Sequence, residues 1–215
     1  FRVRRPILVK KPVGTRQALD GLRVHIIGNG PVVDSLKEKL ASRKALFSKP
    51  FDCVIDLGED VETSFHEAQD MAKQVPKQWI TVTRLGGFDR PVTPQSAVSQ
   101  GAVAGFTKAL GREWEATTAT VLDIAPELDT PATVSVILDE MTVLETANEI
   151  FRSGPRRDTV GYQTVPAPEF KALPDNSVVL VTGGARGICA KIALEIAARS
   201  PVTIILVGRS PLSDT

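Results

Sequence analysis

The residues best suited to chemistry lie near the end of the chain, where glycines follow a short apolar run. The run of residues 178–181 stops at Thr182, residues 183–187 hold three glycines, and residues 188–199 form an amphipathic segment. Glycines in such a turn let the backbone approach a pyrophosphate, and the next helix offers free N–H groups and a positive dipole end. This order of strand, turn and helix predicts the opening of a nucleotide-binding βαβ unit.

A second candidate group ends the next apolar run, residues 202–207, which is followed by Gly208, Arg209 and Ser210. In this kind of unit an acid at the end of the second strand binds the ribose 2′-hydroxyl, whereas an arginine accommodates a 2′-phosphate. Arg209 therefore favours NADPH over NADH. The alternative is that Arg209 is simply a polar residue at the end of a strand. Arg186 can reach either a phosphate or solvent. The predicted cofactor-binding residues are Thr182, Gly183, Gly184, Ala185, Arg186, Gly187, Ile188, Arg209 and Ser210.

The elements that precede this turn alternate between short apolar runs and segments of helical period. Strands are predicted at residues 22–27, 51–57, 79–83 and 120–124, and helices at 32–45, 61–75, 97–115 and 134–141. Such alternation predicts an α/β fold with a parallel sheet and helices on both faces. In the third helix one side is predicted to pack inward, with glycines that permit a close neighbour; its residues are Val98, Gly101, Ala102, Gly105, Phe106, Ala109 and Trp114.

The second half of the chain contains a predicted domain boundary. Residues 149–165 hold the turn Gly154-Pro155 between two extended pieces, which indicates a β-hairpin or a strand leading out, and residues 166–176 contain three prolines. We therefore expect one domain over residues 1–170 and a second, incomplete one over 171–215. A single strand–turn–helix–strand cannot bury both faces of its sheet.

Another strand–turn–helix unit, around residues 28–31, is a poor phosphate site. It has two glycines only, Pro31 removes an N–H donor, and Asp34 places a negative charge in the first helical turn. We expect no nucleotide there.

Composition excludes several classes of function. The net charge of +1 argues against a general attraction to nucleic acid or to an acidic membrane, and no apolar run reaches the ~18 residues of a membrane-spanning helix. Cys53 and Cys189 are well separated, which suggests neither a disulfide scaffold nor a metal site and fits a reducing, cytoplasmic setting. His25 and His66 do not pair as metal ligands. The first residue is Phe1 rather than Met, which suggests a piece of a longer protein.

Residues 182–188, Thr-Gly-Gly-Ala-Arg-Gly-Ile, and residues 207–210, Val-Gly-Arg-Ser, resemble the short-chain dehydrogenase/reductase superfamily. More narrowly, they resemble ketoreductase domains of polyketide synthases and of polyunsaturated-fatty-acid-type synthases. Such ketoreductases contain two tandem subdomains, a shortened and inactive Rossmann-like structural half and a complete NADPH-binding catalytic half. The resemblance implies a three-layer Rossmann-like fold with a mostly parallel sheet, followed by the opening βαβ unit of a second Rossmann subdomain.

The resemblance also implies an activity and partners. The parent would use NADPH to reduce a β-ketoacyl thioester carried on an acyl carrier protein, beside other domains of the same synthase. An active member carries a tyrosine four residues before a lysine on its active-site helix, and those places are Ser96 and Gln100 here. Residues 154–157, Gly-Pro-Arg-Arg, resemble the family's strand before the second half. Cys189 replaces a glycine usual in the turn, and we expect binding to survive.

No catalytic residue is assigned in this chain. Tyr162, the only tyrosine, precedes the cofactor motif and has no lysine four residues later, so we expect it to pack in a strand. Two alternatives remain open at this point. One is a non-catalytic Rossmann-like scaffold of a multidomain synthase, and the other is a different NADP-dependent short-chain reductase.

Overall fold

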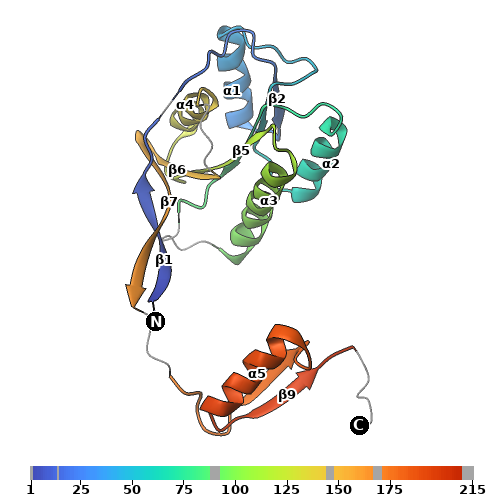
Figure 1. The fold of residues 1–215 in the computed structure, drawn as a ribbon. Helices are drawn as coiled ribbons and strands as arrows, with labels where there is room; N and C mark the ends of the chain where they lie inside the picture. Colours follow the sequence, from blue (N-terminus) through green and yellow to red (C-terminus); the bar gives the residue numbers. More distant parts are fainter. Residues whose placement is uncertain (1, 14, 88–92, 144–147, 167–170, 210–215) are drawn as a thin grey trace. The chain divides into compact units, whose positions relative to one another are not determined.

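The computed structural model describes residues 2–13, 15–87, 93–143, 148–166 and 171–209, and the chain divides into two compact units (Figure 1). The large unit comprises Arg4–Thr164, and the small unit comprises Val165–Thr215 with Phe1–Val3. The division lies a few residues before the boundary expected from the sequence, and residues 167–170 are outside the described ones.

The large unit is built on a sheet in the order β1-β7-β6-β5-β4-β3-β2. Five neighbours run parallel: β2 (Val24–Ile27), β3 (Cys53–Asp56), β4 (Gln78–Thr83), β5 (Thr118–Ile124) and β6 (Glu149–Ser153). β7 (Arg156–Pro166) is antiparallel to β6, and β1 (Arg2–Lys10) lies at the edge beside β7. The predicted mostly parallel sheet and the predicted hairpin are confirmed.

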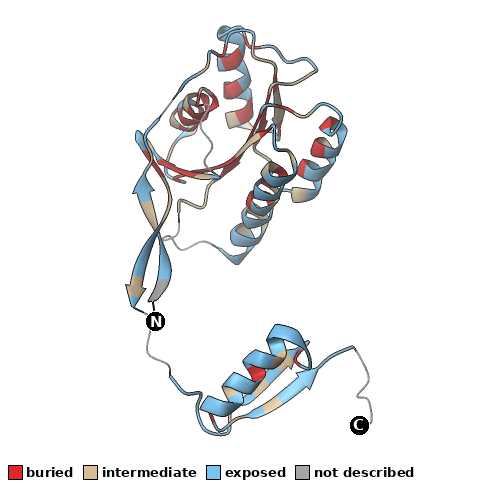
Figure 2. Ribbon diagram, viewed as in Figure 1, coloured by how far each residue is buried: buried red, intermediate tan, exposed pale blue. Residues whose placement is uncertain are grey.

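Helices cover both faces of this sheet, as predicted (Figure 1). α1 (Pro31–Ser42) and α4 (Thr130–Met141) pack on one face through a core that includes Leu36, Ile137 and Ile55. α2 (Val61–Met71) and α3 (Pro94–Glu113) pack on the other face, around Trp79 and Leu110. Figure 2 shows the buried residues along the sheet and on the inward sides of the helices.

The crossovers between the parallel strands are of both hands. Because β2 to β6 lie side by side in chain order, every crossover steps in the same direction along the sheet. The hand of each one then depends only on the face that its helix covers. Since α1 and α4 cover one face and α2 and α3 the other, two of the four crossovers are left-handed, a hand that is rare in proteins.

α3 buries a different side from the one that the sequence predicted. Its buried residues are Val103, Ala104, Thr107 and Leu110. Phe106 and Trp114 do pack against the core, but Val98 is 68% exposed and Ala102 and Ala109 are exposed. No described atom outside the helix lies within 4 Å of a Cβ built on Gly101 or Gly105, so the close packing that these glycines permit is not used by a described neighbour. The helix has apolar residues on several sides. Which side becomes buried is decided by the position of the helix on the sheet.

Buried charges hold the β6–β7 hairpin against α4. Arg157 and Glu140 form a two-point ion pair, with Nη2 2.6 Å from Oε1 and Nε 3.0 Å from Oε2. Both side chains are 4% exposed. Arg152 adds bonds to Asp139 at 2.9 Å and to Glu140 at 3.3 Å. Arg157, the second arginine of the predicted Gly-Pro-Arg-Arg strand, therefore has a structural role in the large unit.

The small unit is a parallel pair of strands with one helix. β8 (Val178–Thr182) pairs with β9 (Thr203–Val207), and α5 (Gly187–Arg199) connects them. Val178, Leu180 and Ile205 alternate onto one face and are 64%, 62% and 47% exposed, respectively. Of the described residues in this unit, Gly184, Ala193 and Ser200 are the buried ones. The expected open face of this sheet is confirmed.

Candidate nucleotide-binding turn and its counterpart in the large unit

The turn after β8 is tied to the end of β9 by its own backbone. The N–H of Gly183 donates to the carbonyl oxygen of Val207 at 2.6 Å. Gly183 makes this bond at φ +67°, a left-handed conformation that favours glycine. The bond brings the start of the glycine turn beside the strand end that precedes Arg209.

Glycine is required at two further positions, for different reasons. A Cβ on Gly184 would lie 2.6 Å from Leu206 Cδ2 and 2.9 Å from the carbonyl oxygen of Val181, so this buried position has no room for a side chain. Gly187 has open space around it but adopts φ +58° where the helix begins. Gly184 therefore allows the turn to pack closely against the strands. Gly187 allows the backbone conformation with which α5 begins.

The N-terminus of α5 has no side-chain cap. Its N-cap residue, Arg186, is extended and makes no capping hydrogen bond, and the first helical turn contains no acidic residue. By contrast, α2, α3 and α4 are capped by Asp60, Thr93 and Asp129, whereas α1 also lacks a side-chain cap but has Asp34 in its first turn. The first N–H groups of α5 are thus free of a side-chain acceptor among the described residues. With the positive end of the helix dipole, they suit an anion such as a pyrophosphate.

The structure brings most of the predicted site residues together. Thr182 ends β8, Ala185 and Arg186 are exposed in the turn, and Ile188 is 77% exposed in the first turn of α5. Arg209 follows β9 and is exposed. Ser210 lies outside the described residues. The side chain of Arg186 makes no hydrogen bond or ion pair with another described residue, so both interpretations, contact with a phosphate or with solvent, stay open.

The counterpart turn between β2 and α1 is closed to phosphate. A Cβ on Gly28 would lie 3.1 Å from the backbone carbon of Leu57, so this turn packs directly against the segment after β3. Pro31 occupies the first helical turn, and Asp34 adds a negative charge there. The same strand–turn–helix order therefore lacks the donor and the sign of charge that an anion needs.

Ser96 and Gln100, at the places where a reductase has tyrosine and lysine, make structural bonds. The Thr93 hydroxyl donates to Ser96 Oγ at 2.9 Å, and the Ser96 N–H donates back to Thr93 Oγ1 at 3.2 Å, which caps α3. The side-chain oxygen of Gln100 accepts the backbone N–H of Arg84 at 2.6 Å. Arg84 in turn donates to the carbonyl oxygens of Pro126 and Leu128. These side chains fix the loops at the strand ends.

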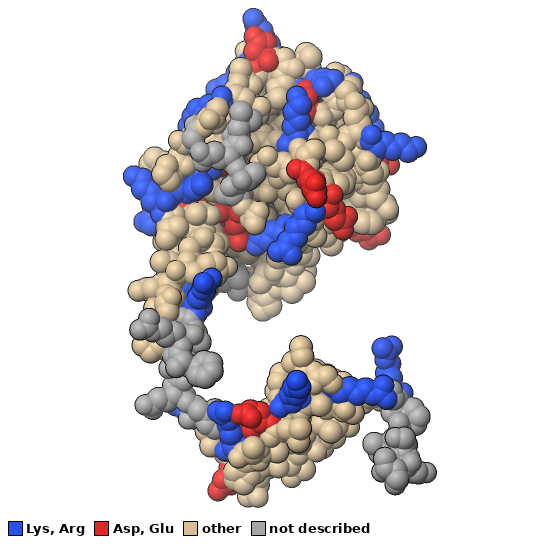
Figure 3. Space-filling model, in the orientation of Figure 1, with Lys and Arg blue, Asp and Glu red and all other residues tan. Residues whose placement is uncertain are grey.

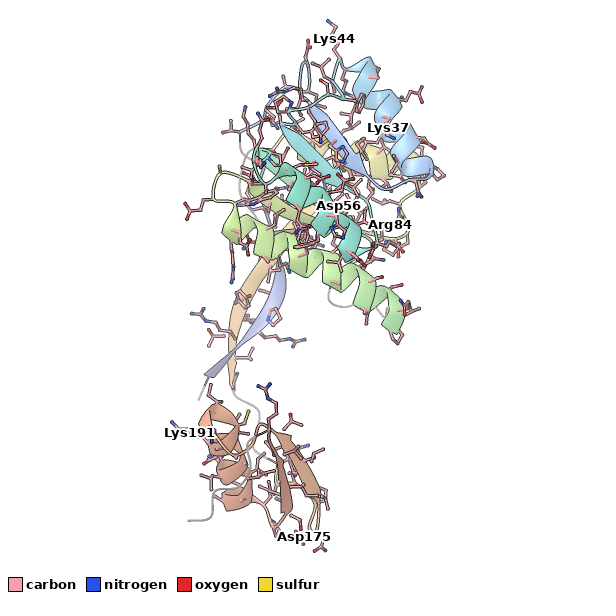
Figure 4. All side chains as sticks on the ribbon, turned by 90° about the vertical axis from the view of Figure 1, so that its right-hand side faces the viewer. Lys37, Lys44, Asp56, Arg84, Asp175 and Lys191 are labelled. Atoms are coloured by element: carbon pink, nitrogen blue, oxygen red, sulfur yellow. The ribbon has the colours of Figure 1, made fainter. Side chains whose placement is uncertain are left out.

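Sequence reasoning missed three buried carboxylates at or near the carboxyl ends of the strands and on β7. Asp56, Asp123 and Asp158 are 0%, 3% and 5% exposed. Asp56, labelled with Arg84 in Figure 4, accepts the Ser64 hydroxyl at 2.7 Å and the Gly58 N–H at 2.9 Å. Burial raises the pKa of Asp56, and these bonds partly offset the rise. Asp56 and Asp123 each lie inside an apolar run of the sequence, and this pattern could have identified them as buried acids.

Residues 2–13, 15–87, 93–143, 148–166 and 171–209 hold no cluster of three metal-ligating side chains. Within the same residues, no helix has the length and apolarity needed to cross a membrane. Figure 3 shows both signs of charge spread over the visible face of the large unit.

Solved structures share this architecture across nearly the whole chain. A-type ketoreductases from a modular polyketide synthase superpose with a TM-score of 0.68 at 17% identity, over 96% of this chain and 53% of that chain. The chain has the fold of a polyketide synthase ketoreductase. A ketoreductase domain from the bacillaene assembly line gives a TM-score of 0.65 at 22% identity, over 99% and 50% of the two chains.

A third ketoreductase, from the first module of phoslactomycin biosynthesis in Streptomyces sp. HK803, gives a TM-score of 0.63 at 17% identity. That match covers 94% of this chain and 47% of the other. The chain thus spans about half the length of the ketoreductase structures that it matches. No protein-family model matches the sequence, and no curated protein matches it. The resemblance read from residues 182–188 and 207–210 is confirmed at the level of the fold.

Proposed function

We propose that this chain is part of an NADPH-dependent reductase of β-ketoacyl thioesters in a polyketide or fatty-acid-type synthase. The observation that carries the proposal is the turn of the small unit, where an uncapped helix N-terminus follows three glycines, one without room for a side chain and two at positive φ. Rossmann-type folds bind dinucleotides at such a turn, which supports a nicotinamide cofactor here. Residues 1–170 act as the structural half, and residues 171–215 open the catalytic half.

In this proposal the chain's own residues hold the cofactor, and the bound cofactor supplies the hydride. The N–H groups at the start of α5 bind the pyrophosphate, and Gly184 holds the turn that carries them close against β8 and β9. Arg209 pairs with the 2′-phosphate, which gives the preference for NADPH. No residue of this chain is assigned a proton-transfer role.

The partners proposed are an acyl carrier protein that delivers the β-ketoacyl substrate and other domains of the same synthase. One structural neighbour, described as an adenylation, ketoreductase and pseudo-Asub multidomain structure of a keto acid-selecting NRPS module, shares the fold with a TM-score of 0.65 at 11% identity. That ketoreductase is flanked by other domains in one chain. The comparison supports an assembly-line setting for this chain.

The test is binding of NADP⁺ and NAD⁺ to the 215-residue chain by calorimetry. We expect NADP⁺ to bind more tightly, and Arg209→Ala to raise its dissociation constant about tenfold or more, because an ion pair to a phosphate is lost. NAD⁺ lacks the 2′-phosphate, so its binding should not change. Lys191→Ala removes an exposed positive charge from α5 and is the matched control (Figure 4). Equal losses for both cofactors, or no binding of either, would contradict the proposal.

A second candidate is a Rossmann-like scaffold without catalysis. It is favoured by the structural bonds of Ser96 and Gln100 in the large unit. The two candidates differ in one measurement on the longer parent protein, which is oxidation of NADPH in the presence of a β-ketoacyl thioester. Turnover supports the reductase. Cofactor binding without turnover, together with no Tyr-x-x-x-Lys segment after the turn, supports the scaffold.

A further inference from the structure

A cavity of about 540 Å³ lies in the large unit, far in sequence from the cofactor turn. Its floor is made by the carboxyl ends of three parallel strands, through Gly86 after β4, Asp123 and Ala125 at the end of β5, and Ser153 at the end of β6. β1 and β7 supply the remaining walls. In open α/β sheets this is the edge at which ligands bind.

The cavity exists because one face of the sheet is only partly covered. Leu122 and Ile150 point into the core under α1 and α4, so their neighbours Asp123 and Phe151 point to the opposite face. Asp158 on β7 is paired directly with Phe151 and shares that face. α2 and α3 are centred on β3, β4 and β5 there, and no described helix continues over β6 and β7.

The two carboxylates that line the cavity, Asp123 and Asp158, differ in the number of hydrogen bonds that they accept. Asp123 accepts the Thr83 hydroxyl and the Leu85 N–H on Oδ1, each at 2.8 Å, and the Gly87 N–H on Oδ2 at 2.6 Å. Asp158 accepts only the Nε of Arg156, on Oδ2 at 2.6 Å. Its Oδ1 is buried and has no hydrogen-bond partner among the described residues. A buried carboxylate oxygen without a donor is costly, so this wall is suited to a ligand that brings one.

Two of the three arginines that line the cavity are available to an anion. Arg152 is buried and donates to Asp139 and Glu140. Arg5 on β1 is exposed, and Arg156 on β7 keeps its two terminal nitrogens free of any described partner while its side chain is 66% exposed. A guanidinium group presents paired donors that match a carboxylate or a phosphate. Ile7, Leu8 and Phe151 add apolar wall between these groups.

We propose that this cavity binds a small organic anion that also carries a hydroxyl group, such as a hydroxylated carboxylate or phosphate ester. Its anionic group pairs with Arg5 and Arg156, and its hydroxyl donates to Asp158. The site is separate from the cofactor turn and does not depend on the function proposed above. It gives the large unit, which has lost its phosphate-binding turn, a ligand of its own.

The test is calorimetric titration of the whole chain with glycerol 3-phosphate and with glycerate, compared with inorganic phosphate and with glycerol. We expect one of the two hydroxylated anions to bind at least about tenfold more tightly than phosphate or glycerol, since it satisfies both ends of the cavity. Which one binds better identifies the anionic group. Equal affinity for all four probes, or no binding, means a water-filled cavity only and overturns the proposal.

Variants assign the binding to these side chains. Arg5→Gln should weaken the best probe about fivefold or more, whereas Arg4→Gln, its neighbour in β1 that does not line the cavity, should leave it unchanged. Asp158→Leu should remove the advantage of the hydroxylated anion over phosphate. Because Arg5 is exposed, its variant keeps the test decisive even if Asp158→Leu fails to fold. An equal loss for Arg4→Gln and Arg5→Gln contradicts the proposed site.

Discussion

The chain contains the same strand–turn–helix unit twice, and the two copies have opposite properties. The β2–α1 copy lies in a seven-stranded sheet and packs its turn at 3.1 Å against Leu57. Neither helix has a side-chain cap, but the β8–α5 copy has one open sheet face. The first copy begins its helix with Pro31 and Asp34, and the second begins with Gly187 and no acid.

The difference separates stability from anion binding. An anion needs N–H groups that have no partner in the protein, and such groups lower the stability of the helix that carries them. In the large unit, Pro31 removes one of these donors and Asp34 places a negative charge beside the others, while apolar cores cover both faces of the sheet. The small unit keeps the donors and leaves its apolar strand face exposed.

The largest expected effect is on the buried ion pair of the large unit. Glu140→Ala should lower the free energy of unfolding by about 3–5 kcal/mol, because Arg157 is left as an unpaired buried charge. Both tryptophans, Trp79 and Trp114, lie in the large unit, so urea unfolding followed by tryptophan fluorescence reports on this unit alone. The control is Glu195→Ala, which breaks the exposed Arg199 pair on α5 and should leave that transition unchanged. A similar shift for both variants would show that the two units do not unfold independently.

A smaller effect is expected in the turn of the small unit. Gly184→Ala should cost about 1–3 kcal/mol, because the added methyl group meets Leu206 and the backbone of Val181. Amide hydrogen exchange should lose protection across β8, α5 and β9 while the tryptophan transition stays in place. Gly208→Ala, a position with nothing within 4 Å and no positive φ, should preserve protection. If amide exchange is unchanged in Gly184→Ala, the close packing of Gly184 against Leu206 and Val181 is contradicted.

The smallest expected effect is the pH-dependent contribution of Asp52 to stability, at the start of the β2–α1 copy. The hydrogen bond from Arg23 lowers the pKa of Asp52 to about 2, below its value of about 4 in an unfolded chain. The contribution of Asp52 is therefore present above about pH 4 and is lost as the pH falls through about 2. The stability difference between the wild type and Asp52→Asn should shrink from pH 5 to pH 2 in tryptophan-monitored urea titrations. Asp20→Asn, in an exposed pair with Lys44 at 4.0 Å, is the control and should show no such change. A difference that is constant with pH would contradict the role of Asp52.

Sequence reasoning predicted the order and type of the elements because these depend on local periodicity. The strand ending at Ile27, the helix with Leu36 and Leu40 inward, and the turn at Gly183 all follow from residues close in the chain. It failed on α3, where Val98 is exposed and Val103 is buried, because small apolar residues occur on several sides of that helix. The helix pattern is then too weak to choose a face.

By itself the sequence determined the α/β alternation and the glycine turn with Arg209 beyond the next strand. The tertiary structure alone decided the two left-handed crossovers, the pairing of Glu140 with Arg157, and the unpaired oxygen of Asp158 at a cavity. The physical reason is the range of the forces involved. Periodicity and turn chemistry act between near neighbours, whereas the partner of a buried charge is supplied by whichever strand or helix the fold brings beside it.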